Sequence, residues 1–79
     1  MTLRELEAHA AENPSDAATR VEIGLERERR GDWAGAVDAY EQALALKPQY
    51  AKARRGLERA HAAAAAAAAA DAAPPRIAA

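Results

Sequence analysis

The sequence contains no cysteine, so neither a disulfide framework nor thiol chemistry is available to the chain. It also lacks an excess of either charge, because 11 basic residues stand against 12 acidic ones and the formal net charge is -1 at pH 7. The two signs are interspersed along the chain, which argues against broad attraction to nucleic acid or to a membrane surface. We therefore expect no nucleic-acid partner and no membrane partner.

Long apolar runs are missing as well. The alanine tract of residues 62–70 is the longest candidate, and it is too short to span a bilayer. Near the start, Arg4, Glu5 and Glu7 stand where a secretory signal would have an apolar stretch. We expect a cytoplasmic protein. The excess of arginine over lysine, together with abundant alanine, suggests a bacterial source with a GC-rich genome.

Large apolar side chains are few. Of the 51% of residues that count as hydrophobic, 26 are alanine, which leaves 14 larger ones. A chain of 79 residues allows one small domain, in which apolar burial nearly cancels the conformational entropy lost on folding. We expect marginal stability, a stabilising partner or self-association.

The most informative stretch runs from Gly31 to Pro48. Gly31 suits the left-handed conformation that ends a helix, and Asp32 suits the cap of the next helix. Apolar residues then recur at helical spacing, until Pro48 excludes the α conformation at Lys47. The pattern predicts a helix end, a tight turn and a second, short helix. The apolar residues of that second helix are Trp33, Ala36, Val37, Tyr40, Ala43, Leu44 and Leu46.

With its Gly-Asp-Trp start and its Ala36, Tyr40, Ala43 and Pro48, this stretch resembles the second half of a tetratricopeptide repeat (TPR). That repeat is a helix-turn-helix unit of about 34 residues. Upstream, an aliphatic and a small residue stand where the family's first helix has them. The residues there are Ile23 and Gly24.

Two positions depart from the family pattern. Arg20 stands where the family usually has Trp, and Arg27 stands where it usually has Tyr. Aromatic packing between the paired helices is therefore lost at both positions.

The same period recurs within the chain. Pro48 lies 34 positions after Pro14, and Leu57 lies 34 positions after Ile23. The residues before Pro14 therefore resemble the second helix of a preceding repeat, and those from about position 50 resemble the first helix of a following one. The resemblance covers one complete unit, residues 17–50, between two half-repeats.

These observations predict an all-α fold of about four helices, arranged as TPR-like antiparallel hairpins. The expected helices are residues 2–12, 16–30, 33–47 and 49–72. We expect a single domain over residues 1–73, with a long alanine-rich last helix that overhangs the others, and a disordered tail over residues 74–79. By the resemblance, the residues that pack the repeats together are Ile23, Gly24, Trp33, Ala36, Tyr40, Ala43, Pro48 and Leu57.

Candidate binding residues form two stripes. One stripe follows the spacing i, i+4, i+7 on the helix of residues 16–30, and a basic stripe follows i, i+3, i+7 at the start of the last helix. The resemblance implies that both stripes line the concave groove in which the family binds its partners. The six candidate residues are Val21, Leu25, Glu28, Lys52, Arg55 and Arg59.

No catalytic set is visible, because the nucleophile candidates Ser15 and Thr19 are expected to lie apart from either histidine. Glu58 and His61 form one Glu-x-x-His turn, which is half of the ligand set that helical bundles use for paired metals. The comparable pair, His9 and Glu12, has the reversed order. We expect no enzymatic activity, no cofactor and no metal site.

We predict a non-catalytic protein-protein interaction module, an adaptor or scaffold, that binds a peptide or protein segment in a helical groove. For the basic stripe two hypotheses stay open, a preference for acidic extended peptides and simple solvated charge. The alternative function is a self-assembly element, which would make a second copy of the chain the partner. A metal-binding helical protein is the least favoured class.

Overall fold

The computed structural model describes residues 2–72, which form four helices and contain no strand. The helices are α1 (Leu3–Glu12), α2 (Ala17–Arg29), α3 (Trp33–Leu46) and α4 (Ala51–Ala72). This confirms the predicted all-α fold and the four helices, whose ends lie within two residues of the predicted ones. The tail predicted as disordered lies outside the described residues.

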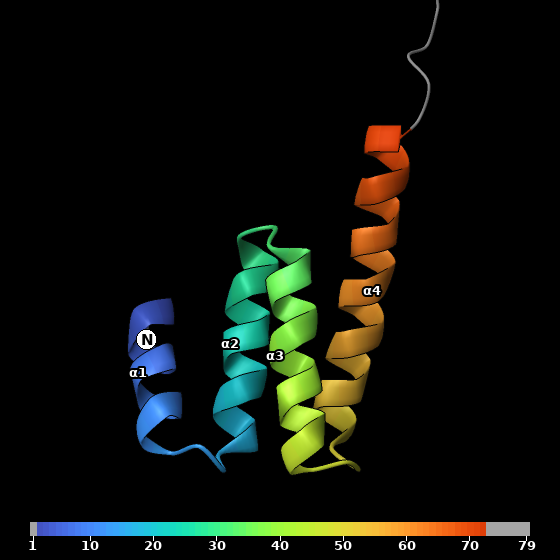
Figure 1. Ribbon diagram of the computed structural model, residues 1–79. Coiled ribbons are helices and arrows are strands. Elements are labelled where there is room, and N and C mark those ends of the chain that lie inside the picture. The colour runs from blue at the N-terminus through green and yellow to red at the C-terminus, as the bar shows by residue number, and fades with distance from the viewer. Residues whose placement is uncertain (1, 73–79) are drawn as a thin grey trace, which may run out of the picture.

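The four helices stand in a row, and each runs antiparallel to the one before it (Figure 1). Contacts join α1 to α2, α2 to α3 and α3 to α4, and α2 also contacts α4. No such contact joins α1 to α3. The helices are therefore staggered, with α2 and α4 meeting on one side of the row while α1 and α3 stay apart on the other.

Side chains cap the first three helices at their N-termini. Thr2, Asp16 and Asp32 each accept the backbone N–H three residues further on, at 3.0 to 3.2 Å. These bonds satisfy donors that the first turn of a helix leaves without an intrahelical partner. Each of these three helices therefore begins directly after a Thr or Asp that caps it.

The turn between α2 and α3 and the end of α3 follow the sequence pattern. Gly31 has a φ of 75°, the left-handed conformation that glycine adopts without strain. Lys47 has left the α conformation, with φ -143° and ψ 87°, directly before Pro48. The predicted turn after α2 and the predicted stop after α3 are both confirmed.

Tyr40 of α3 lies at the centre of the core and is fully buried. Gly24 of α2 and Gly56 of α4 both face its ring. A Cβ atom added at Gly24 would lie 2.7 Å from the ring, and one added at Gly56 would lie 2.5 Å from it. Because real Cβ atoms do not approach so closely, the two glycines are what allow α2 and α4 to pack on one aromatic ring.

Two clusters of buried apolar side chains hold the row together, and most of their members are alanine. The larger cluster joins α2, α3 and α4 and consists of Ala17, Val21, Ala36, Tyr40, Ala43, Ala53 and Ala60. The smaller cluster joins α1, α2 and α3 and consists of Leu6, Ala10, Ile23 and Ala39. Such small side chains let the helices approach closely but leave little apolar area to bury.

The residues that the TPR resemblance assigns to packing differ in burial. Five are buried, namely Ile23, Gly24, Ala36, Tyr40 and Ala43. Trp33 and Leu57 are half-buried, and Pro48 is exposed in the turn after α3.

The last helix has two halves with different surroundings. Ala53, Gly56 and Ala60 are buried against the neighbouring helices, whereas every alanine from position 65 to position 69 is exposed. The second half of α4 extends past the turn between α2 and α3 (Figure 1). Within residues 2–72, no helix has both the length and the apolar character that a bilayer-spanning segment needs.

Candidate functional site

An open groove lies where the C-terminal part of α2, the start of α3 and the middle of α4 meet. It has a volume of about 610 Å³. We call it the α2–α4 groove, and the residues that line it are Leu25, Glu28, Arg29, Trp33, Arg59 and Ala63. Three of these residues are apolar and three are charged, so the groove offers a mixed surface.

Glu28 anchors the polar part of the groove. Its side chain is only 11% exposed, and its carboxylate accepts hydrogen bonds from two other helices. Tyr40 Oη of α3 donates to Oε2 at 3.0 Å, and Arg59 of α4 donates through Nη2 at 2.8 Å and through Nε at 3.0 Å. Charge-assisted bonds of this forked kind fix the relative position of both partners. The three residues therefore tie α2, α3 and α4 together beneath the groove.

The same contacts determine the protonation of the two donors. Burial, followed by the hydrogen bond to the Glu28 carboxylate, raises the pKa of Tyr40 to about 12. Hydrogen bonding to Glu28 raises the pKa of Arg59 above its ordinary value. At neutral pH, Tyr40 therefore remains a proton donor and Arg59 remains a cation.

The structure brings three of the six candidate binding residues together in this groove, namely Leu25, Glu28 and Arg59. Leu25 is 38% exposed, and among the residues whose burial the structure describes Leu46 is the other large apolar side chain that is exposed. Glu28 and Arg59 are paired with one another, so a partner would meet them as a unit.

The other three candidate residues lie elsewhere. Val21 is 3% exposed and belongs to the cluster around Tyr40, so it has almost no surface to offer a partner. Lys52 and Arg55 are exposed on the first part of α4, outside the groove lining.

Three further groove residues were not among the sequence-based candidates. Trp33 was assigned to packing, and the structure places it half-buried in the groove wall. Arg29 and Ala63 are related by the 34-residue shift, as are Leu25 and Arg59. Because both pairs lie in the groove, the internal period could have located Ala63 opposite α2.

The two sides of Leu25 carry opposite charge. On the α4 side, the Arg29 side chain is 78% exposed and lies 3.4 Å from a Glu26 oxygen, and Arg59 stands beyond it. On the α1 side, a hollow of about 310 Å³ is lined by Glu22 and Glu26 together with Leu6, Leu25 and Arg29, so acids outnumber cations there. A bound acidic segment would therefore lie toward α4.

The histidines do not build a metal site in the described part of the chain. No three or more His, Cys, Asp or Glu residues gather closely enough there to hold a metal ion. His9 Nε2 instead lies 3.2 Å from Asp16 Oδ2, which connects α1 to the start of α2. Hydrogen bonds from Thr19, with a smaller contribution from His9, lower the pKa of Asp16. Glu58 and His61 are both exposed on α4.

Comparison with family models, curated proteins and solved structures gave no match to this chain. The TPR resemblance therefore remains an interpretation of the residues and spacings described above.

Proposed function

We propose that the chain is a non-catalytic protein-protein interaction module, an adaptor or scaffold, that binds an acidic extended segment of a partner protein in the α2–α4 groove. The observation that carries this proposal is the exposure of Leu25 beside Trp33, with Arg29 and Arg59 at the margin. Apolar surface with a few placed polar groups is typical of binding sites. An extended segment that carries one large apolar residue next to acidic residues would match it.

The apolar part of the groove supplies binding free energy. Leu25 leaves 38% of its surface exposed, and covering that remainder contributes about 1 kcal/mol. Trp33 is half-buried and can lose further surface to a ligand. A segment that covers both residues would also displace water from around the Glu28 and Arg59 pair, which strengthens that pair.

The charged part favours acidic ligands. The charge of Glu28 is balanced by Arg59. Arg29 in the groove lining pairs with Glu26 but is 78% exposed, and Lys52 and Arg55 are exposed earlier on α4, outside the groove lining. Attraction by solvent-exposed charges increases the association rate and weakens as salt is added.

Trp33 provides a direct test, because it is the single tryptophan of the chain and lines the groove. Capped synthetic peptides with a central Leu between two Glu residues would be titrated against the protein while tryptophan fluorescence is recorded. We expect saturable binding that weakens with salt, and weaker binding by the otherwise identical peptide with Gln in place of Glu. Equal affinity for the two peptides, or unchanged fluorescence, would contradict the proposal.

A matched pair of variants tests the place of binding. Leu25→Ala removes an exposed leucine from the groove, whereas Leu46→Ala removes one that is 42% exposed but lies outside it. We expect the first substitution to weaken the fluorescence-detected binding several-fold and the second to leave it unchanged. If both substitutions weaken it equally, the ligand does not bind in the groove.

A self-assembly element is the second candidate, and the exposed alanines at positions 65–69 of α4 favour it. Small side chains on every side of a helix allow another helix to approach closely. Sedimentation over a range of protein concentrations would test this function. Reversible association that Ala66→Lys abolishes would support it, and a monomer at all concentrations would count against it.

A further inference from the structure

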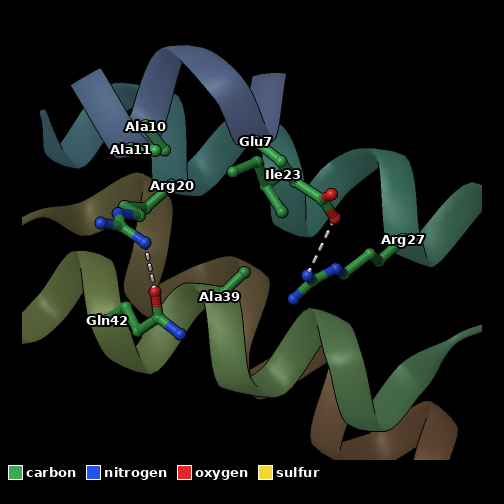
Figure 2. A pocket seen from close by; sticks show the side chains of 8 residues that line it. All are labelled: Glu7, Ala10, Ala11, Arg20, Ile23, Arg27, Ala39 and Gln42. Carbon is green, nitrogen blue, oxygen red and sulfur yellow. Dashed lines mark hydrogen bonds and ion pairs between the residues drawn. The ribbon is translucent and has the colours of Figure 1, made fainter. Parts of the chain in front are cut away.

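A second hollow surface lies between α1 and α3, which do not contact one another. Figure 2 shows one part of it, lined by the labelled side chains, with α2 and α4 behind. We call it the α1–α3 channel. Its first part has a volume of about 200 Å³ and is lined by Glu7, Ala10, Ala11, Arg20, Ile23, Arg27, Ala39 and Gln42. Its second part continues beside the loop that follows α1, has a volume of about 230 Å³ and is lined by Pro14, Arg20, Gln42, Ala45 and Leu46.

Arg20 and Gln42 line both parts of the channel, so their side chains mark the place where the two parts join. Arg20 Nη1 donates a hydrogen bond to Gln42 Oε1 at 2.6 Å (Figure 2). The floor of the first part is formed by Ile23 and Ala39, which are only 4% and 2% exposed, whereas in the second part Leu46 is 42% exposed. The channel thus offers a cation beside one exposed apolar side chain.

The two arginines of the channel differ in their partners. Arg27 donates to the backbone oxygen of Gly35 at 3.0 Å and to Glu7 Oε1 at 3.2 Å, so its charge is balanced. Arg20 has only the neutral amide of Gln42, and its Nε is buried without any hydrogen-bond partner. A buried donor without an acceptor loses its hydration and gains nothing in return.

Among the cations that the structure describes, the combination of partial burial with the absence of an acidic partner is specific to Arg20. Several other cations in the described part of the chain also lack an acidic partner, but all of them are exposed, so water solvates them. Arg54 is one of these, and it stands 34 positions after Arg20, at the equivalent position of the internal period. Arg20 alone among the described cations is both half-buried and without a carboxylate, an arrangement that a charged acceptor would stabilise.

We infer that Arg20 binds a carboxylate, supplied by an Asp or Glu side chain of a partner segment that lies along the α1–α3 channel. The carboxylate replaces the neutral Gln42 amide as the acceptor for the guanidinium and provides a second acceptor for Nε–H. An apolar residue next to the acid packs against Leu46. The site lies on different helices and residues from the α2–α4 groove, and it does not depend on the function proposed for that groove.

The continuity of the channel favours a protein segment over a small free acid. The channel continues on both sides of Arg20 and includes the exposed Leu46 on one side, and a free dicarboxylic acid would leave that side chain uncovered. Charge complementarity at Arg20 selects an acidic residue at the centre of that segment. The first part of the channel has a net positive charge, because Glu7 balances the charge of Arg27 and the charge of Arg20 is not balanced by an acid.

The Nε–H resonance of Arg20 in a proton-nitrogen correlation spectrum measures the proposed contact directly. It can be assigned by its absence in Arg20→Lys. The probes are a capped peptide with a central Glu-Leu pair, the same peptide with Gln-Leu, and glutarate as a free acid. We expect the Glu-Leu peptide to shift the resonance at concentrations at which Gln-Leu and glutarate leave it in place. An unchanged resonance with the Glu-Leu peptide, or an equal shift with glutarate, would overturn the inference.

Variants separate this site from general charge effects. Arg20→Lys keeps the charge but loses the guanidinium fork, and we expect about a tenfold or greater loss of affinity for the Glu-Leu peptide. Arg54→Lys makes the same change at an exposed arginine and should leave the affinity unchanged. Equal losses of affinity in the two variants would mean that the peptide is held by nonspecific charge attraction, which would overturn the inference.

Gln42→Glu provides a second test that does not depend on how well Arg20→Lys folds. It places a carboxylate where the Gln42 amide now lies 2.6 Å from Arg20, so the site is filled from within the chain. We expect this variant to lose binding of the Glu-Leu peptide in the channel. Wild-type affinity in a folded Gln42→Glu protein would refute the proposed site.

The two leucine variants distinguish the channel from the groove. Leu46→Ala should weaken the peptide-induced shift at Arg20, and Leu25→Ala should not, which is the reverse of the pattern expected for Trp33 fluorescence. If the peptide changes the Trp33 fluorescence but does not shift the Arg20 resonance, the channel is rejected and the groove is kept. The opposite result rejects the groove and keeps the channel. A shift at Arg20 that survives Leu46→Ala at full strength would contradict the proposed course of the segment.

Discussion

The two sides of the helix row differ in how closely alternate helices approach each other. On one side, α4 reaches α2 because Gly24 and Gly56 leave room for both helices against the Tyr40 ring. On the other side, α1 and α3 do not meet, and Arg20 and Arg27 occupy the space between them. Residues without side chains thus produce a tight three-helix contact, whereas long polar side chains leave a channel.

The comparison extends to the ion pairs on the two sides. Glu28 pairs with Arg59 on the groove side, and Glu7 pairs with Arg27 on the channel side. The acid is 11% exposed in the first pair and 48% exposed in the second. Burial of a carboxylate makes its partner more important, because the charge that remains after the partner is removed cannot be solvated.

The largest effect is expected when the close approach of α4 is blocked. Gly56→Val would place side-chain atoms inside the space of the Tyr40 ring, and with so small a core we expect the folded state to be lost. Gly56→Ala is the sharper variant, because alanine in place of glycine ordinarily stabilises a helix by about 1 kcal/mol. Here we expect destabilisation, measured by chemical denaturation and circular dichroism. A more stable Gly56→Ala protein would show that α4 does not pack on Tyr40 as described.

A somewhat smaller effect is expected when the buried carboxylate loses its cation. Arg59→Met keeps much of the aliphatic stem but leaves Glu28 with only the Tyr40 hydroxyl, and we expect a loss of about 2 kcal/mol in the free energy of unfolding. Arg55→Met is the matched control, since Arg55 is exposed one turn earlier on the same helix. Equal and small losses in both variants would contradict the structural role of the Glu28 and Arg59 pair.

The raised pKa of Tyr40 predicts a loss of stability at alkaline pH. The pKa rises from 10.0 to about 12 on folding, so the stabilisation is complete below pH 10 and is lost as the pH rises through 12. Near pH 11 the loss amounts to about 1 kcal/mol. The unfolding free energy should be measured against pH in Tyr50→Phe, in which the tyrosinate absorbance comes from Tyr40 alone. Ionisation of Tyr40 in the folded protein at its ordinary pKa would contradict its burial.

Local features explain why the helix ends could be predicted from the sequence. Gly31, Asp32 and Pro48 each act on the backbone within a few residues, so their effects do not depend on the rest of the fold. The internal period located the helix pairs in the same way. What these features specify is where each helix begins and ends.

The contacts of each helix face were harder to predict. The stripe that contains Val21 has the correct helical spacing, but spacing on one helix does not reveal that the core around Tyr40 covers Val21 and leaves Leu25 exposed. Likewise, the period aligns Glu58 with Gly24, yet Gly56 is the residue that faces the ring. Such contacts depend on how α4 is rotated against α3, which a single sequence pattern does not determine.

The smallest expected effect concerns the ion pair on the channel side. Glu7→Gln removes an acid that is 48% exposed, and we expect a change of at most about 0.5 kcal/mol in the free energy of unfolding. Glu28→Gln, the same change on the groove side, should cost more, because Glu28 is buried and serves both Tyr40 and Arg59. Parallel denaturation of the two variants decides the comparison, since equal losses would mean that burial of the acid does not set the strength of these pairs.

Glu7→Gln also leaves Arg27 without its carboxylate, so a Glu-Leu peptide should bind the channel of this variant more tightly than it binds the wild-type protein.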